Sequence, residues 1–328
     1  MINRRKVLSA VLTGMMAATA VAGSALVATA ETAWPEKPVR IIVSFPPGGS
    51  SDLIARLLSE HLTTELGQQF VVENKPGAAG TVAATALMEA EGDGYTLMLS
   101  NLTPFSVAPT RFPDTPYDPI ADFSHVTYIG TVNLGLFVRP SLEVSDFAGF
   151  MELVKSAPGD IDYGTSGVGS WGQVISVQFQ AETGAEMVHV PYKGSGPLRQ
   201  DFRADVIPVI FDAIPQNLPS VADGETIPLA VSSKERVPTL PDTPTFTELG
   251  YPIVAENWLG VSAPAGLDSE ISAKLDGALQ KVMAMPAVSD QFETWGIIRG
   301  TKTSAEFSDY VASQATSWAP LVKAAVKK

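Results

Sequence analysis

The 328-residue sequence contains no cysteine, and only three of its residues are histidine. The absence of cysteine excludes disulfides, thiol catalysis and a lipid-modified N-terminal cysteine. His61, His125 and His189 lie far apart and match no metal-ligand spacing, and His189 alternates with apolar neighbours as a strand residue does. We therefore expect the protein to hold no metal ion and no cofactor.

Basic residues are also scarce, because 22 Lys and Arg stand against 35 Asp and Glu, which gives a formal charge of −13. An acidic chain of this kind is a poor partner for nucleic acid and for anionic membrane surfaces. Any anion that it binds must be held by local dipoles instead of by the overall field of the protein.

Long hydrophobic runs are missing outside the N-terminal region. Arg4, Arg5 and Lys6 precede an uncharged run over residues 7–28, and Ala28-Thr-Ala30 has the A-x-A form of a cleavage site. We interpret residues 1–30 as a signal peptide, removed on export to the periplasm, which takes the formal charge from −13 to −16 because three basic residues are lost. A retained membrane anchor is the alternative, and the arginine pair also resembles a twin-arginine signal.

Short apolar runs alternate with helix-like segments, and the length of the chain favours two domains. Two such series are present, over residues 39–100 and 147–231. This rhythm predicts an α/β fold in which helices cover both faces of a mostly parallel sheet. Between the two series, residues 101–124 carry five prolines and are expected to form a long irregular connection.

Two apolar runs, residues 126–139 and 257–263, bracket the second series. We predict that they form strands that cross between the domains, which returns the C-terminal helices to the first domain. The expected division is residues 31–130 with 257–328 for domain 1, and residues 131–256 for domain 2.

The stretch "VSFPPGGSSDLIAR", residues 43–56, leads a strand into a helix through a turn that has few side chains. Its prolines end the strand ladder and its glycines permit positive φ. The bare amides of Gly48, Gly49 and Ser50 then stand at a positive helix end, which favours a bound carboxylate or phosphate. A helix start without any ligand is the alternative.

Polar side chains in the same stretch have structural interpretations. Ser50 or Ser51 is expected to cap the helix through its hydroxyl group. Asp52 and Arg56 lie at i, i+4 on one helical face, and we interpret this pair as a brace for the helix.

A second turn, "YGTSGVGSWG" at residues 163–172, satisfies G-x-G-x-x-G after a strand. The next strand ends in Pro191 without the acidic residue that a dinucleotide ribose requires, which argues against a nucleotide site. A helix N-terminus that carries hydroxyl groups remains, again able to face an anion. An exported α/β hydrolase that uses Ser166 or Ser170 is the enzyme alternative, although no G-x-S-x-G motif and no positioned base is present.

Two further polar positions follow predicted strands. Tyr192 and Lys193 lie in a strand-to-helix turn, where a lone lysine is commonly a solvated charge. Asp212 follows an apolar run at the carboxyl edge of the predicted sheet, where ligands of α/β proteins gather, or else caps the helix before Ile214.

Several segments together resemble the exported substrate-binding receptors of tripartite tricarboxylate transporters, the Bug proteins. The resemblance implies a type II periplasmic binding-protein fold, with two doubly wound α/β domains joined by two crossing strands. It also implies a monomeric receptor, not an enzyme, that closes by a hinge on a small organic mono- or dicarboxylate and delivers it to membrane permease subunits. The matching segments are residues 34–56, "VVENKPGAAG" (71–80), "VPYKGSGPL" (190–198), "LAVSSKERVPTLPDTPTFTELG" (229–250) and the Gly169-Ser-x-Gly turn.

The resemblance also implies which residues contact the ligand, largely through main-chain amides and ordered water. Members commonly have a histidine where this chain has Gln173, beside the bulky Trp171, so the acid that is bound stays open, as does a scavenger or sensor without a permease. The implied contacts are Phe45, Gly48, Gly49, Ser51, Asp52, Asn101 and Thr103 in domain 1, and Ser166, Gly167, Ser170, Tyr192, Lys193 and Asp212 in domain 2.

Overall fold

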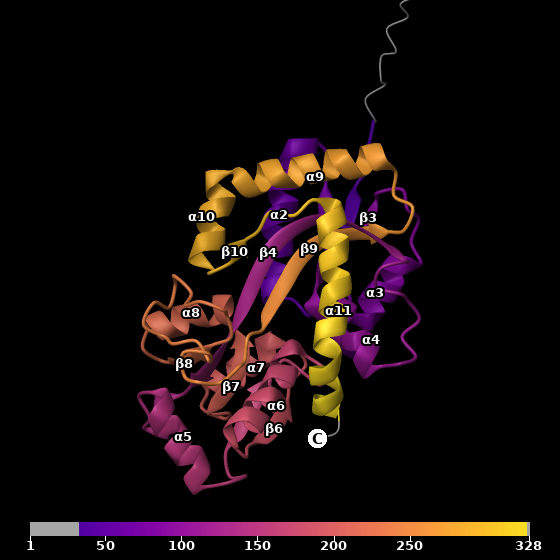
Figure 1. The fold of residues 1–328 in the computed structure, drawn as a ribbon. Helices are drawn as coiled ribbons and strands as arrows, with labels where there is room; N and C mark the ends of the chain where they lie inside the picture. The colour runs from indigo at the N-terminus through magenta and orange to yellow at the C-terminus, as the bar shows by residue number, and fades with distance from the viewer. Residues whose placement is uncertain (1–32, 327–328) are drawn as a thin grey trace, which may run out of the picture. The chain divides into compact units, whose positions relative to one another are not determined.

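The computed structural model describes residues 33–326, so the predicted signal peptide at residues 1–30 lies outside the described part. The described residues form one ten-stranded sheet with helices on both faces (Figure 1). Its main path has the order β2-β1-β3-β9-β4-β7-β5-β6, while β8 and β10 pair with β4 outside this path. The sequence rhythm therefore predicted the α/β class correctly.

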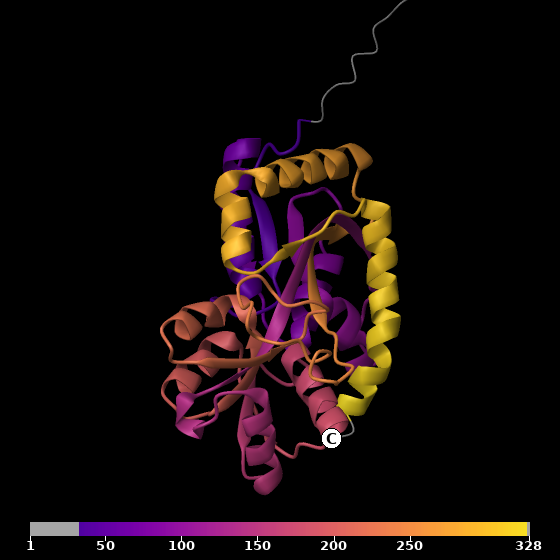
Figure 2. The ribbon, with the colours of Figure 1, turned by 60° about the vertical axis from the view of Figure 1, so that its left-hand side comes forward.

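The first half of the sheet contains three parallel strands followed by an antiparallel one. The strands of this half are β2 (Phe70–Asn74), β1 (Val39–Val43), β3 (Thr96–Asn101), β9 (Glu256–Pro264) and the short β10 (Ile298–Arg299). Its helices are α2 (Ser50–Leu66), α3 (Thr81–Met88), α9 (Ser269–Ala284) and α10 (Pro286–Thr294). Figure 2 shows α9 and α10, in orange, gathered at this half, where α9 packs against α2 and β4.

The second half of the sheet repeats the βα pattern. Its strands are β5 (Asp162–Thr165), β6 (Val188–Pro191), β7 (Val209–Ala213) and β8 (Ile227–Val231). Its helices are α5 (Phe147–Ser156), α6 (Trp171–Thr183), α7 (Ser195–Arg203) and α8 (Ile214–Ala222).

Strand β4 (Phe123–Val138) belongs to both halves. Its residues 123–133 pair with β9, and its residues 134–138 pair with β7 and β8. Where β4 changes partners from β9 to β7, the Ser232 hydroxyl accepts from the Leu134 amide at 3.0 Å. The same hydroxyl donates to the carbonyl of Ala255, one residue before β9 begins. The first apolar run singled out in the sequence, which lies in β4, thus carries the chain between the halves, whereas the second run, in β9, pairs within the first half.

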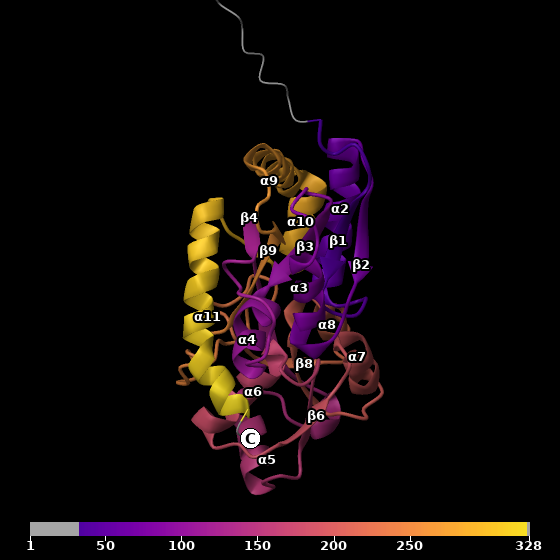
Figure 3. The same ribbon diagram turned by 90° about the vertical axis from the view of Figure 1, so that its right-hand side faces the viewer.

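The C-terminal helix α11 (Ser304–Val326) lies along the molecule and touches both halves (Figures 1 and 3). It packs against β4, against the short helix α4 (Ala108–Arg111) and also against α6 of the second half. Helices α9 and α10 therefore lie on the first half, whereas α11 extends to both halves.

Local sequence explains most element boundaries, and α5 is a clear example. Its buried residues Phe147, Phe150, Met151 and Val154 follow the i, i+3, i+4, i+7 spacing of an amphipathic helix. The carboxylate of Asp146 accepts the Gly149 amide at 2.8 Å and caps the N-terminus. Burying each of the larger apolar side chains contributes about 1.5–3 kcal/mol.

One prediction is wrong, because the proline-rich segment 101–124 is partly helical. A π-helical turn, η2 (Thr103–Val107), leads into the short helix α4 (Ala108–Arg111). Pro104 and Pro109 occupy the first turn of each element, where a missing N–H costs no intrahelical bond. The prolines therefore start these helices and do not exclude them.

Candidate functional site

The turn between β1 and α2 ends in a helix start that no side chain of the turn itself caps. Gly49 is the N-cap residue, with an extended backbone (φ −85°, ψ 168°), and it offers no side chain to the free amides. The predicted caps Ser50 and Ser51 instead lie in the first helical turn, so that prediction is wrong. Among the described residues, no protein group accepts from the amides of Gly49 and Ser51.

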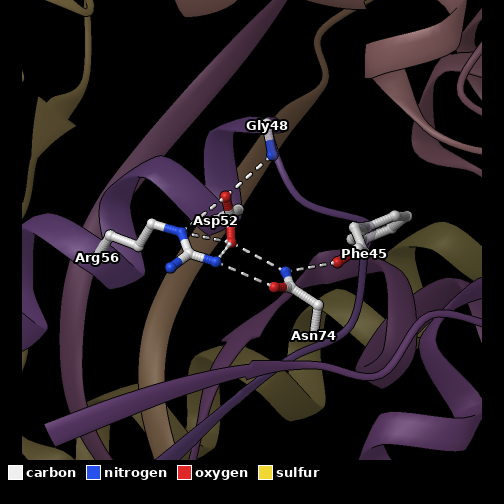
Figure 4. A network of polar contacts seen from close by, with 5 residues as sticks. All are labelled: Phe45, Gly48, Asp52, Arg56 and Asn74. Carbon is white, nitrogen blue, oxygen red and sulfur yellow. Dashed lines mark hydrogen bonds and ion pairs between the residues drawn. The ribbon is translucent and has the colours of Figure 1, made fainter.

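Asp52 holds this turn from within (Figure 4). Its carboxylate accepts from the Gly48 amide at 2.9 Å, from Asn74 Nδ2 at 3.0 Å and from the Arg56 guanidinium at 3.0–3.1 Å. Asn74 Nδ2 also donates to the Phe45 carbonyl at 3.0 Å, which ties the strand end to the helix. Burial raises the pKa of Asp52, but the hydrogen bonds from Arg56, Gly48 and Asn74 outweigh it and hold the pKa below its usual value. The interpretation of Asp52 and Arg56 as a brace is confirmed.

An inner cavity of about 50 Å³ lies where this turn meets the second half of the sheet. Its walls come from the carboxyl ends of β1, β5 and β7, from the starts of α2, α6, α7 and α8, and from strands β4 and β9. Six of the predicted residues line it: Phe45, Gly49, Ser51, Thr103, Ser166 and Asp212. The remaining lining residues are Pro46, Ser50, Leu134, Trp171, Gly172, Ser195, Phe211, Ala213, Gln216 and Asn257.

Two side chains of the second half reach across to the first turn. The Gln216 amide, oriented by its hydrogen bonds, accepts from the Ser50 amide at 2.6 Å and donates to the Ala213 carbonyl at 3.2 Å. Arg199 donates to the Gly48 carbonyl at 3.1 Å and to the Gln216 carbonyl at 3.2 Å. These contacts join α7 and α8 to the N-terminus of α2.

Asp212 supplies a buried carboxyl group to the wall of the inner cavity. It accepts from the Ser195 hydroxyl at 2.7 Å and from Asn217 Nδ2 at 3.0 Å. Burial raises the pKa of Asp212. This effect exceeds the lowering of the pKa by the hydrogen bonds from Ser195, Asn217 and the Ala213 backbone amide and by the Arg199 charge. The side chain lies within β7, and the N-cap of α8 is Ala213, so Asp212 is not a helix cap.

In the second turn, before α6, two backbone amides donate to side chains of the same segment. Ser170 is the N-cap, and its hydroxyl accepts from the Gln173 amide at 3.2 Å. Gln173 Oε1 in turn accepts from the Gly169 amide at 2.6 Å. Trp171, which is 6% exposed, lines the inner cavity, and its indole Nε1–H has no acceptor among the described residues.

An outer cavity of about 330 Å³ adjoins the inner one and shares Phe45, Pro46 and Ser166 with it. The predicted residues Gly167, Ser170, Tyr192 and Lys193 line this cavity, together with the unpredicted loop at residues 76–80. The Tyr192 hydroxyl donates to Asp201 at 3.0 Å, and burial together with Asp201 raises the pKa of Tyr192 to about 12. In the loop, Ala78 and Ala79 have φ of 45° and 52°, which is strained for residues other than glycine.

Three predicted residues line neither cavity: Gly48, Asp52 and Asn101. Gly48 and Asp52 bond to each other, as described above. Asn101 is fully buried, donates to the Ser44 hydroxyl at 3.1 Å and accepts from the Thr103 amide at 3.0 Å. Asn101 therefore positions residues that face the cavities.

Several cavity residues escaped the sequence reasoning. Ser195 and Gln216 follow strands β6 and β7, so the rule that ligands gather at the carboxyl edge of a sheet applies to both. Leu134 and Asn257 enter from β4 and β9, and no local sequence signal marks them.

In residues 33–326, the two serines considered as nucleophiles have no hydrogen-bonded base. His189 Nε2 lies 2.7 Å from the Thr165 hydroxyl, and no described histidine or carboxylate is hydrogen-bonded to Ser166 or Ser170. Within the same residues, no group of three His, Asp or Glu side chains is placed to hold a metal ion. No helix in this part of the chain is long and apolar enough to cross a membrane.

Comparison with known proteins gives consistent matches. The family model of the tripartite tricarboxylate transporter family receptor matches residues 54–326. BugT of Bordetella pertussis is 34% identical over 306 residues, which are 93% of this chain and 94% of that protein. The structure of R. palustris Rpa4515 with adipate has a TM-score of 0.85 and 30% identity, over 89% of this chain and 98% of that chain. The structure of the periplasmic binding protein BugD has a TM-score of 0.84 and 30% identity over the same shares.

Proposed function

Because this chain belongs to the tripartite tricarboxylate transporter receptor family, we propose that a carboxylate of its ligand binds in the inner cavity at the N-terminus of α2. The observation that carries the proposal is the uncapped helix start, where the amides of Gly49 and Ser51 lack protein acceptors among the described residues. Anions are stabilised at such an end by its N–H groups and by the helix dipole.

Membership of the family fixes the general activity. The protein is a periplasmic solute receptor for organic carboxylates that works with a tripartite transporter, and it is not an enzyme. It has the two-domain α/β fold of periplasmic binding proteins.

The finer features stay proposals. We infer that the ligand is a small mono- or dicarboxylate and that the receptor is a monomer. The outer cavity, which adjoins the inner one, gives a longer acid room to extend past Phe45 and Ser166. Adipate, found in the similar structure of Rpa4515, is an acid of that kind. Light scattering coupled to gel filtration tests the monomer, which a dimer mass contradicts.

We further propose that the protein closes by a hinge at the crossing strands, between residues 31–130 with 257–328 and residues 131–256. Opening would break the contacts of Arg199 with Gly48 and of Gln216 with Ser50, which join the two halves. Arg199→Ala should therefore shift the receptor toward an open form with a larger radius of gyration. Small-angle X-ray scattering of the variant and the wild type in saturating ligand measures this, and identical radii would contradict the hinge.

Export by a cleaved leader is likewise a proposal. We expect the mature protein to begin at Glu31, after the Ala28-Thr-Ala30 site. N-terminal sequencing of protein from the periplasmic fraction tests the cleavage. Replacement of Arg4 and Arg5 by lysine tests the twin-arginine route, since that route requires the arginine pair.

The binding proposal is tested by calorimetry with a panel of mono- and dicarboxylates, with hydrolytic turnover assayed in parallel. We expect saturable binding of at least one acid without turnover. Turnover that Ser166→Ala abolishes would overturn the receptor function, and unchanged affinity in Gly49→Val would overturn the assigned position of the carboxylate.

A further inference from the structure

The outer cavity is lined partly by exposed residues, and the inner cavity is not. All the residues that line the inner cavity are buried or half-buried, and Phe45, Pro46 and Ser166 belong to both cavities. We therefore expect a ligand to pass through the outer cavity on its way to the start of α2. The exposed lining residues of the outer cavity are Pro76, Gly77, Ala78, Val168 and Lys193.

The two halves of the sheet meet at the wall of the outer cavity, where a glycine of the second half faces a proline of the first. Gly194 is buried, and a Cβ there would lie 2.9 Å from Cγ and 3.2 Å from Cδ of Pro46. The atoms of a proline ring cannot swing away as the end of a flexible side chain can. A side chain at position 194 would therefore push Pro46 aside or part the two halves.

Gly169 makes a second contact of the same kind, one residue before the lining residue Ser170. Gly169 is also buried, and a Cβ there would lie 3.3 Å from the Ala79 Cβ. The next two atoms that it would meet, at 3.6 and 3.9 Å, belong to Arg111 and Phe112. All three neighbours lie in the first half, so the absence of a side chain at position 169 lets the second turn approach the first half closely.

The loop that carries Ala79 has an unusual backbone. Residues 77–80 have φ of 143°, 45°, 52° and 89°, and the two middle values are strained because they belong to alanines. Among the described residues, no hydrogen bond joins this loop to the second half, whereas Arg199 and Gln216 bond across to the first turn at the inner cavity. The loop thus meets Gly169 by van der Waals contact alone, and a few such contacts part easily.

We propose that residues 77–80, Gly169 and Gly194 form a gate of the outer cavity, which closes over the bound acid and must part before the acid leaves. This inference rests on the proposed function, because it takes the carboxylate to bind at the start of α2. Gly169 and Gly194 are then positioning residues. They act by letting the halves approach closely and not by bonding the acid, so they set the rate of release.

Three variants separate a gate from an ordinary need for glycine. Gly169→Ala adds a Cβ that meets Ala79, and Ala79→Gly in the same chain removes the methyl group that it meets. Gly184→Ala is the matched control, because Gly184 follows α6, has φ of 70° against 74° at Gly169, and a Cβ there meets nothing within 4 Å. Both alanine variants carry the same backbone cost of positive φ, and only Gly169→Ala also changes the contact.

Stopped-flow dilution of the complex, followed by tryptophan fluorescence, measures release of the acid that binds tightest in a panel that includes succinate, glutarate and adipate. In Gly169→Ala we expect the dissociation rate constant to rise about three- to tenfold, with the association rate constant within about twofold of the wild type. Addition of Ala79→Gly should return the dissociation rate constant to within about twofold of the wild type, and Gly184→Ala should leave it there. If Gly169→Ala does not fold, Gly194→Ala against Gly184→Ala decides by the same comparison.

Equal dissociation rate constants in Gly169→Ala, Gly184→Ala and the wild type would overturn the gate and leave the receptor function intact, because glycine would then serve only the backbone conformation. A raised constant that Ala79→Gly does not restore would also overturn the gate, since Ala79 would not be the contact. Failure of every acid of the panel to bind would overturn the proposed function and the gate with it.

Discussion

The two strand-to-helix turns at the inner cavity, residues 46–51 and 166–170, treat their helix starts differently. The second turn is capped by Ser170, and Gln173 accepts from its Gly169 amide. The first turn has no side-chain cap, and its Ser50 amide finds an acceptor only in Gln216, from the other half of the sheet. Both turns are glycine-rich and look alike in sequence. The amides of Trp171 and Gly172 also lack acceptors among the described residues, but only the first turn has no cap from its own side chains. We therefore place the ligand carboxylate at the first turn.

The largest expected effect comes from filling the space in front of the uncapped turn. A Cβ at Gly49 meets nothing closer than 3.9 Å, so the backbone and its surroundings accept a side chain. Gly49→Val should weaken carboxylate binding by about 10–100-fold, because the branched side chain separates the ligand from the amides. The loss of unfolding free energy should stay below about 1 kcal/mol, as for a change of N-cap residue.

Calorimetry and thermal unfolding of the same samples measure both effects, with Gly49→Ala as the smaller matched change. Parallel losses of affinity and stability would mean that the first turn is only structural.

The brace behind the first turn should matter for stability. Asp52→Asn removes the charge that Arg56 pairs with and should cost about 1–3 kcal/mol of unfolding free energy at neutral pH. Because the folded-state pKa of Asp52 is lowered, its contribution is present above the unfolded pKa and is lost as the pH falls through the folded value. Urea unfolding from neutral pH to pH 3 should show the difference from the wild type shrinking below about pH 4. A difference that does not change with pH would contradict the ionised brace.

Substitutions at the neighbouring residues Gly48 and Gly49 should have opposite effects: the first should lower stability, and the second should lower affinity. Gly48 has φ of 86°, a region that costs residues with a Cβ about 1–2 kcal/mol, although no other atom lies within 4 Å of the position that a Cβ would take there. Gly48→Ala should therefore lower the unfolding free energy by this amount and leave affinity almost unchanged. Denaturant titration measures the loss of stability, and calorimetry measures the affinity. An unaltered stability would contradict the prediction and show that the backbone of the turn changes conformation to accept alanine.

The smallest effect is expected at the capped turn. Ser170→Ala removes the hydrogen bond to the Gln173 amide and should cost about 1 kcal/mol of unfolding free energy. Carboxylate affinity should change by less than about threefold, because we expect this hydroxyl to cap the helix and not to hold the ligand. A loss as large as that of Gly49→Val would remove the contrast between the two turns.

Much of the fold follows from the sequence. Helices α5, α6 and α9 begin after Asp146, Ser170 and Asp268, whose side chains cap them, as the preference for such residues at helix starts indicates. The proline-rich segment was misread, because proline at a helix start resembles proline in a loop. Whether a proline starts a helix or lies in a loop depends on the packing of the residues that follow it. Here those residues form η2 and α4, which pack against α11.

The site is predictable only in part. Gly49 and Ser166 follow strands and Asp212 lies near the carboxyl end of β7, so the carboxyl-edge rule finds them. The rule cannot tell which amides are already bonded, and so it placed Gly48 among the contacts although Asp52 accepts from its amide. Likewise, the position of Gln216 over Ser50 depends on how the two halves of the sheet meet, which no short stretch of sequence encodes.

The position of the carboxylate is tested most sharply by the amide signals of protein labelled with ¹⁵N at glycine, followed during titration with the tightest-binding acid. We predict that the Gly49 signal moves strongly as its N–H gains a carboxylate acceptor. The signals of Gly48 and Gly169 should move little, because Asp52 and Gln173 already accept from them. A large shift at Gly169 with an unmoved Gly49 would contradict this assignment and place the carboxylate at the second turn.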